Sequence, residues 1–179
     1  MNLRPIHITD AEAYLDLLHQ LDASSAYTLV EPGERLTAIR EQMDEIRSIE
    51  ASPNQCLLIV EDGDLLVAWI GAFGSSYRRI RHTVSIGIGV IAAYQRRGIG
   101  TWLFEELEAW AWKRDISRLE LLVAAENKPA ISLYRKMGFQ IEGTKRESYR
   151  LDARLIDEYL MSKLLKKPVP PPHNPPPRW

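Results

Sequence analysis

The chain has 179 residues, of which 45% are hydrophobic and 26% are charged, a composition typical of a soluble globular protein of one domain. Its single cysteine, Cys56, excludes an intramolecular disulfide framework and a cysteine-based zinc finger. The net charge of −1 argues against nucleic acid as the main partner, and no run approaches the roughly 20 apolar residues of a membrane span. Because the N-terminus also lacks the apolar stretch of a secretory signal, we expect a cytoplasmic protein without a membrane partner.

The charges are unevenly distributed along the chain. Residues 1–55 carry four basic and ten acidic side chains, whereas residues 56–165 are nearly balanced. Acidic groups that line a cleft raise the local concentration of cations, so this acidic third could attract a cationic ligand. The simpler interpretation, which we prefer, is that these acids solvate two surface helices.

The N-terminal part predicts a short strand followed by two helices. Residues 3–7 have the composition of a strand. Thr9 and Glu12 have the spacing of a capping box, after which apolar residues recur with helical periodicity. A proline-glycine turn at 30–35 separates this helix from a second one near residues 37–50.

The middle of the chain predicts an antiparallel meander and then a helix. Two apolar runs, 56–61 and 65–73, flank Asp62-Gly63-Asp64, which is a strong hairpin signal. Residues 83–90 alternate as a further strand. From residue 98 to about residue 114 the apolar period becomes helical.

The C-terminal part alternates strand and helix. A short strand at 119–123 precedes a helix at 128–137, and two further strands follow, near 139–147 and 155–165. The sum is an α/β fold of one domain over residues 1–165, with a sheet of about seven strands and helices on its faces.

Residues 166–179 differ from everything before them. They hold seven prolines in 14 residues, which favours polyproline II and excludes a helix interior or a central strand. This proline-rich tail could be a plain extension, or it could dock on its own domain, on a second subunit or on a partner, and the sequence leaves these alternatives open.

The most informative segment is residues 90–101, VIAAYQRRGIGT. A strand leads into residues 95–100, and a helix begins at once. Glycines at 98 and 100 let the backbone turn tightly and let its N–H groups approach a ligand. Because those N–H groups lie at a helix N-terminus, they favour an anion such as a pyrophosphate, and Arg96 and Arg97 add positive charge. We call residues 95–101 the phosphate loop.

Two other phosphate-binding motifs do not fit. The P-loop pattern G-x-x-x-x-G-K-[ST] is absent. Gly87, Gly89 and Ala92 have the spacing of a dinucleotide fingerprint, but no helix begins inside that motif and no acidic residue ends the next strand. Gly87 and Gly89 are instead typical of a strand that another group approaches closely.

Residues 95–100 resemble the Q/R-x-x-G-x-G/A signature of the GNAT superfamily of acetyl-CoA-dependent N-acetyltransferases. A second block of that family is matched by residues 126–139, ENKPAISLYRKMGF, and residues 142–165 resemble the closing hairpin of the branch with ribosomal-protein and amino-acid N-acetyltransferases. The resemblance covers nearly all of residues 1–165. It implies a mixed, mostly antiparallel sheet of about seven strands flanked by about four helices.

The resemblance assigns CoA binding to the phosphate loop and to two neighbouring strands. The pantetheine arm would lie where the strand that ends at Val90 splays from the strand at 119–123, bonded to backbone groups such as those of Ile88 and Val90. A backbone N–H near Val90 would polarise the thioester carbonyl. Asn127 would contact the arm or the local backbone. The pyrophosphate would lie on the phosphate loop, made of Gln95, Arg96, Arg97, Gly98, Ile99, Gly100 and Thr101.

The resemblance implies a catalytic acid but leaves the general base open. Tyr134 would donate a proton to the departing thiolate, although a tyrosine at this spacing also suits a helix core. Many relatives carry a Glu on the strand before the loop, where Ser85 stands here; a serine hydroxyl can only hold a water in a relay. Glu31 and Glu34, between the first two helices, could bind the acceptor's ammonium group or accept its proton through water, or they could simply be solvated loop acids.

The resulting functional hypothesis is acetyl transfer from acetyl-CoA to a primary amine by direct attack in a ternary complex. The acceptor would be a small cationic amine, an amino acid or a peptide N-terminus. An alternative from another class is a non-catalytic CoA-binding sensor, which the proline-rich tail and the missing strand carboxylate motivate. The four histidines lack metal-ligand spacing, so we expect no metal. A homodimer through a sheet edge or the tail is compatible with the sequence.

Overall fold

The computed structural model describes residues 1–165, so the alternatives for the proline-rich tail, residues 166–179, lie outside the described residues. The described part forms four α-helices, two 3-10 helices and seven strands. The helices are α1 (Ala11–Ser24), α2 (Ile39–Ala51), α3 (Ile99–Lys113), α4 (Lys128–Lys136), η1 (Ile8–Asp10) and η2 (Ala92–Tyr94). The strands are β1 (Asn2–Pro5), β2 (Gln55–Asp62), β3 (Leu65–Gly74), β4 (Thr83–Val90), β5 (Arg118–Ala124), β6 (Gln140–Leu151) and β7 (Arg154–Leu164).

All seven strands join one sheet in the order β1-β2-β3-β4-β5-β7-β6. Every neighbouring pair is antiparallel except β4 and β5, which run parallel. The parallel pair needs a crossover, and the chain between β4 and β5 supplies it as η2 and α3. The predicted mixed, mostly antiparallel sheet is therefore confirmed.

The β2–β3 hairpin forms at the predicted turn. Asp62 pairs with Leu65, so Gly63 and Asp64 make a two-residue loop. Gly63 has φ +63°, which a residue with a side chain adopts only with strain. The turn sets the register of the two pairs next to it, and a register shift between Val60 and Glu61 changes the register for the rest of the hairpin.

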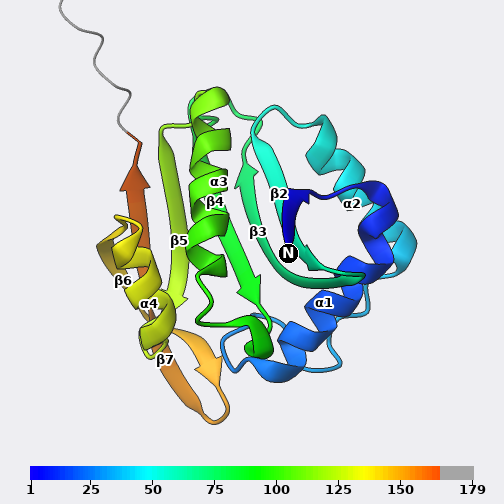
Figure 1. Ribbon diagram of the computed structural model, residues 1–179. Helices are drawn as coiled ribbons and strands as arrows, with labels where there is room; N and C mark the ends of the chain where they lie inside the picture. The colour runs from blue at the N-terminus through cyan, green and yellow to red at the C-terminus, as the bar shows by residue number, and fades with distance from the viewer. Residues whose placement is uncertain (166–179) are drawn as a thin grey trace, which may run out of the picture.

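The helices bury apolar stripes against the sheet. Leu103, Phe104 and Leu107 of α3 are fully buried, and Figure 1 shows α3 crossing in front of the central strands with α4 beside it. Leu17 of α1 and Ile46 of α2 are also fully buried. These side chains belong to one continuous core that runs along the sheet.

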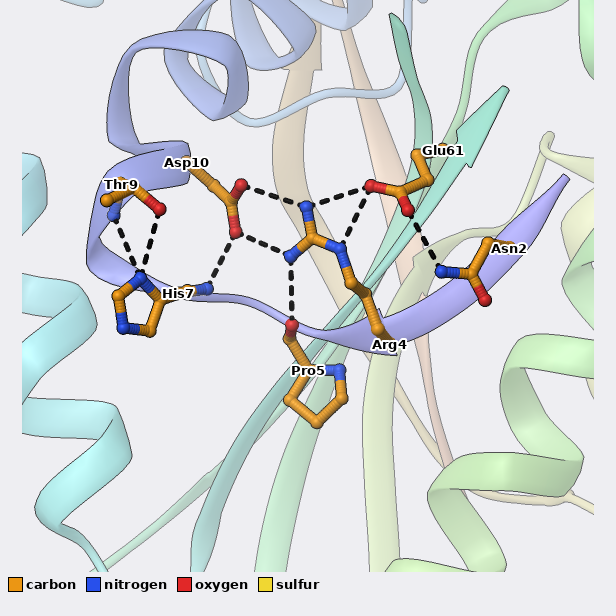
Figure 2. A network of polar contacts seen from close by, with 7 residues as sticks. All are labelled: Asn2, Arg4, Pro5, His7, Thr9, Asp10 and Glu61. Carbon is orange, nitrogen blue, oxygen red and sulfur yellow. Dashed lines mark hydrogen bonds and ion pairs between the residues drawn. The ribbon is translucent and has the colours of Figure 1, made fainter. Parts of the chain in front are cut away.

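An arginine-centred network joins the first strand to the first turn of helix (Figure 2). Arg4 donates to both carboxylate oxygens of Asp10, at 2.7 and 2.9 Å, and to Glu61 of β2, at 2.9 Å. The expected capping box of Thr9 and Glu12 is wrong. The His7 backbone N–H donates to Asp10 at 2.7 Å instead, because η1 precedes α1 and moves the cap two residues toward the N-terminus.

Strand β6 is longer than expected. It was predicted to end near residue 147 but continues to Leu151. Register shifts between Ile141 and Gly143, and between Lys145 and Tyr149, break the period-two alternation that marks a strand in sequence. The long β6–β7 hairpin therefore reaches the loop between α1 and α2 at the lower end of Figure 1. No helix within residues 1–165 is long and apolar enough to cross a membrane.

Candidate functional site

The two parallel strands pair over only three residues. Thr83, Val84 and Ser85 pair with Arg118, Leu119 and Glu120. Beyond Ser85, β4 continues to Val90 and β5 to Ala124 without pairing to one another, so the predicted splay is confirmed. Ile88 and Val90 lie in this part of β4 and pair only with β3. Backbone groups on the β5 side of this segment have no strand partner and need another one.

The phosphate loop ends where α3 begins. Arg96 has φ +61° and Gly98 has φ +83°, which turns the chain sharply into the helix. The first hydrogen bond of α3 runs from Trp102 N to Gly98 O at 3.1 Å. The N–H groups of Ile99, Gly100 and Thr101 therefore have no acceptor within the helix and are directed to its N-terminal end. This is an anion-binding arrangement.

Side chains around the loop hold it in this shape. Gln95 Nε2 donates to the carbonyl oxygen of Val90 at 3.0 Å, so it braces the loop against the end of β4. The Arg97 guanidinium lies 4.7 Å from the centre of the Tyr94 ring, and the Tyr94 hydroxyl donates to Asp62 at 2.9 Å. Gln95 and Arg97 thus shape the loop besides any contact that they make with a ligand.

Helix α4 packs directly on the loop. A Cβ at Gly100 would lie 2.8 Å from Leu133 Cδ2, so the glycine permits this approach. Lys136 Nζ donates to Thr101 Oγ1 at 3.2 Å and brings a further cation to the N-terminus of α3. Sequence reasoning missed Lys136, because only the packing of α4 against α3 brings positions 35 residues apart together.

Asn127 is a helix cap. Its side-chain oxygen accepts a hydrogen bond from Ala130 N at 3.2 Å at the start of α4. Of the two expected contacts for Asn127, the structure contains the one with the local backbone.

Tyr134 lies between α4 and the core. Its ring packs edge-on against Phe104, with ring centres 5.8 Å apart, and tilted against Phe139, at 6.1 Å. Burial raises the pKa of its hydroxyl to about 12. The phenol is thus a weaker acid than a solvated tyrosine, and both are protonated at neutral pH.

The strand glycines lie beneath an indole ring. Cβ atoms at Gly87 and Gly89 would lie 2.8 and 2.7 Å from the Trp69 side chain, and one at Gly89 would also lie 2.5 Å from Leu21 Cδ1. Trp69 Nε1 is the only fully buried side-chain nitrogen or oxygen within residues 1–165 that lacks a hydrogen-bond partner. The two glycines let Trp69 and α1 pack closely against β4. This is the close approach that the sequence predicted, and no helix begins at either glycine.

Ser85 lies at the point where the two strands separate. It is exposed and stands opposite Glu120 in the parallel register. The Arg118 Nε donates to the Glu120 carboxylate at 3.0 Å. A carboxylate thus lies on the strand next to Ser85, although β4 itself offers none.

A cavity of about 390 Å³, here called the loop cavity, lies between the end of α1, the following loop and the β6–β7 hairpin. The Tyr149 hydroxyl of β6 donates to the carbonyl oxygen of Thr28 at 2.7 Å and bridges the two walls. Burial, with Glu158 and Glu31 nearby, raises the pKa of Tyr149. Sequence reasoning missed Tyr149, because its partner lies 121 residues away. The charged lining residues are Asp22, Glu31, Arg150 and Asp152.

The two loop glutamates occupy different places. Glu31 lines the loop cavity. Glu34 does not line it, and its carboxylate accepts a hydrogen bond from the Glu31 backbone N–H at 2.9 Å. Glu34 therefore fixes the turn that presents Glu31.

A second hollow, of about 490 Å³, lies at the end of β5 and the start of β7. Two of its charged lining residues, Glu126 and Arg154, form an ion pair at 3.0 Å. The third, Asp157, accepts a hydrogen bond from the Glu147 backbone N–H. Each charged side chain of this hollow thus already has a hydrogen-bond partner. Within the described part of the chain, no three or more His, Cys, Asp or Glu side chains gather closely enough to hold a metal ion.

Comparison with known proteins settles the family. The model of the acetyltransferase (GNAT) family matches residues 18–139, more than half of the chain. The chain belongs to this family. The matched region includes the splayed strands, the phosphate loop and the Tyr134 helix of this GNAT domain.

Individual relatives agree with this result. The GNAT domain is 34% identical over 88 residues to an L-amino acid N-acetyltransferase of Escherichia coli, a match over 48% of this chain and 54% of the relative. It is 42% identical over 76 residues to an N-alpha-acetyltransferase of Mycobacterium tuberculosis, over 42% of this chain and 45% of the relative. The matches thus span about half the length of these curated relatives.

The fold also has a close counterpart among solved structures. The crystal structure of a GNAT-family acetyltransferase from Streptococcus pneumoniae has a TM-score of 0.89 and 27% sequence identity. The likeness covers 92% of this chain and 99% of that chain. It therefore extends beyond the segment matched by the family model.

Proposed function

We propose that this GNAT domain transfers the acetyl group of acetyl-CoA to a primary amine. The observation that carries the proposal is the separation of β4 from β5 beyond Ser85, directly beside the N-terminus of α3. Strand edges without a partner can bond a narrow polar chain, and the unsatisfied N–H groups at the helix start favour an anion. Acetyl-CoA has both parts, a pantetheine arm and a pyrophosphate.

The phosphate loop would hold the pyrophosphate. The free N–H groups at Ile99, Gly100 and Thr101 supply donors, and Arg96 and Lys136 supply positive charge beside them. The backbone of Ile88 and the N–H of Val90, which have no partner on β5, would bind the amides of the pantetheine arm as a neighbouring strand would, whereas the Val90 carbonyl already accepts from Gln95. An N–H near Val90 would stabilise the negative charge that develops on the thioester oxygen.

The chemistry requires two proton transfers. The amine nitrogen attacks the thioester carbon, the carbon–sulfur bond breaks, and the sulfur leaves with the bonding electron pair. Tyr134, protonated and positioned by its aromatic neighbours, would donate its proton to this thiolate and regain one from solvent. The amine's proton would leave through water, held by Ser85 beside Glu120 or accepted by Glu31 at the loop cavity.

The acceptor would enter through the loop cavity. Its acidic residues favour a cation, and its volume of about 390 Å³ is in the range of small-ligand sites. The likeness to an L-amino acid N-acetyltransferase and to N-alpha-acetyltransferases supports an α-amine, in an amino acid or at a peptide N-terminus.

The test is thiol release from acetyl-CoA with a panel of amino acids, polyamines and short peptides. We expect release with at least one class and none without an amine. Binding of CoA without release from any amine would instead support the non-catalytic sensor, and absence of CoA binding, measured by calorimetry, would refute both. Tighter binding of a dinucleotide than of CoA would support the dinucleotide fingerprint instead.

A further inference from the structure

We propose that the loop cavity selects free α-amino acids, and that Arg150 recognises their carboxylate group. This inference rests on the proposed acetyl transfer and specifies its acceptor. It arises from the pairing of charges around the cavity and from the position of the cavity at the splayed strands.

No residue of β4 or β5 lines the loop cavity, but chain neighbours of its lining residues contact the open part of β4 and the end of β5. On one side, Leu21 of α1 packs against Gly89, and the next residue, Asp22, lines the cavity. On the other side, Ala124 at the end of β5 pairs with Glu158 of β7, whose hairpin carries Tyr149 and Arg150. An acceptor in the cavity would therefore lie at the open end of the splay.

One of the four charged lining residues, and several charges on the neighbouring hairpin, already have partners. Asp22, 4% exposed, binds the Arg35 guanidinium through both oxygens, at 2.6 and 3.1 Å. In the same hairpin as Arg150, Lys145 pairs with Glu158 and Arg154 pairs with Glu126. In each pair the two charges cancel, so the pair attracts a charged ligand only weakly.

Three charges that line the cavity differ from these pairs. Within residues 1–165, the side chains of Arg150, Glu31 and Asp152 form no ion pair or hydrogen bond with another side chain. The cavity thus presents three exposed charges, one guanidinium and two carboxylates, without a hydrogen-bonded side-chain partner among these residues, and Asp152 also lies in the field of Arg154. A ligand that satisfies all of them carries both a carboxylate and an ammonium group.

An α-amino acid has this combination within a few ångströms. A guanidinium binds a carboxylate through two parallel hydrogen bonds, and Glu31 or Asp152 would attract the ammonium group. A polyamine would place a positive charge against Arg150, and an acceptor with a blocked carboxylate would leave Arg150 unpaired. Recognition of the carboxylate therefore discriminates among amines.

The experiment compares an L-amino acid with its amide as acceptors. For the wild type we expect kcat/KM to favour the free acid by at least about tenfold, the size of effect typical of a charge-assisted pair. Arg150→Gln should remove this preference by slowing the acid and not the amide, and Arg150→Lys should retain part of it. Arg146→Gln, on the same strand but outside the cavity lining, is the matched control and should keep the full preference.

Equal use of acid and amide by the wild type would overturn the inference, as would an equal loss for both acceptors in Arg150→Gln. Absence of thiol release with every amine would instead be a failure of the proposed function. Calorimetric titration with the same acid and amide separates the two cases, because it requires no turnover. Tighter binding of the acid, lost in Arg150→Gln, would support the role of Arg150 whatever the kinetics.

Discussion

Tyr134 is a core side chain for which we propose a catalytic role. Phe104 and Phe139 fix the ring, and burial raises the pKa of the hydroxyl to about 12. A hydroxyl that stays protonated at neutral pH is a donor and not a base. Burial does not create this property, because an ordinary tyrosine is also protonated at neutral pH, and the raised pKa makes the hydroxyl a weaker acid. What the aromatic packing supplies is a fixed position for the hydroxyl.

The first prediction concerns this hydroxyl. Tyr134→Phe should lower kcat by about 100-fold or more, since general acids typically contribute that much. The affinity for CoA and the melting temperature should change little, because the ring and its packing remain. Thiol release and calorimetric titration with CoA measure the two effects. An unchanged kcat would remove Tyr134 from the reaction.

A second prediction concerns the bridge across the loop cavity. Tyr149→Phe removes the hydrogen bond to the Thr28 carbonyl at 2.7 Å and loosens the two walls. We expect the KM for the acceptor to rise several-fold, in line with about 1 kcal/mol for a lost hydrogen bond, with the KM for acetyl-CoA unchanged. Steady-state kinetics with each substrate varied in turn would show this split. If both KM values rise together, Tyr149 acts on the fold and not on the cavity.

At the scale of the element, the phosphate loop depends on one backbone conformation. Gly98 has φ +83° and no neighbouring atom within 4 Å of where a Cβ would be. Any effect of a side chain there therefore comes from backbone strain and not from a clash. Gly98 is the N-cap of α3, so backbone strain at this residue would change the direction in which the helix starts.

Gly98→Ala should accordingly destabilise the protein by about 1 kcal/mol and weaken CoA binding at the same time. Two controls separate these effects. Gly63→Ala imposes the same strain at φ +63° in the distant β2–β3 turn and should lower stability only. Gly143→Ala, with ordinary φ and open space, should change neither quantity. Thermal unfolding and CoA titration would be compared across the three variants, and full CoA affinity in Gly98→Ala would count against the loop as the phosphate site.

At the scale of the whole molecule, the Arg4 network fastens the edge strand β1 to η1 and β2. Hydrogen bonds from Arg4 hold the pKa of the Asp10 carboxyl below its usual value. A lowered carboxyl pKa stabilises the fold above the unfolded value near 4, and this stabilisation is lost as pH falls through the folded value.

Arg4→Met should therefore lower the free energy of unfolding by about 1 to 2 kcal/mol at neutral pH, the loss of a partly buried ion pair. The difference from the wild type should shrink as pH falls below 4, because Asp10 becomes protonated in both proteins. Urea unfolding at pH 7 and at pH 3 tests this, with Asn2→Ala, at the exposed margin of the same network, as a control of small effect. A difference that is independent of pH would show that Arg4 acts through packing alone.

Local features made much of this fold predictable. The β2–β3 turn, the phosphate loop and the period of each helix depend on residues close in sequence, so their patterns survive outside the folded context. The splay was expected only from the resemblance to a family. The end of β6 and the start of α1 were predicted wrongly, because register shifts and the arginine network override local periodicity.

The sequence by itself determined the elements, the loop that could hold a pyrophosphate and the family to which those motifs point. Only the tertiary structure decided which charges remain unpaired at the loop cavity, that Lys136 meets Thr101, and that Tyr149 reaches Thr28. The physical reason is distance along the chain. A turn is stabilised by a few adjacent residues, whereas a contact across 121 positions exists only once the whole sheet has set the register of its last two strands.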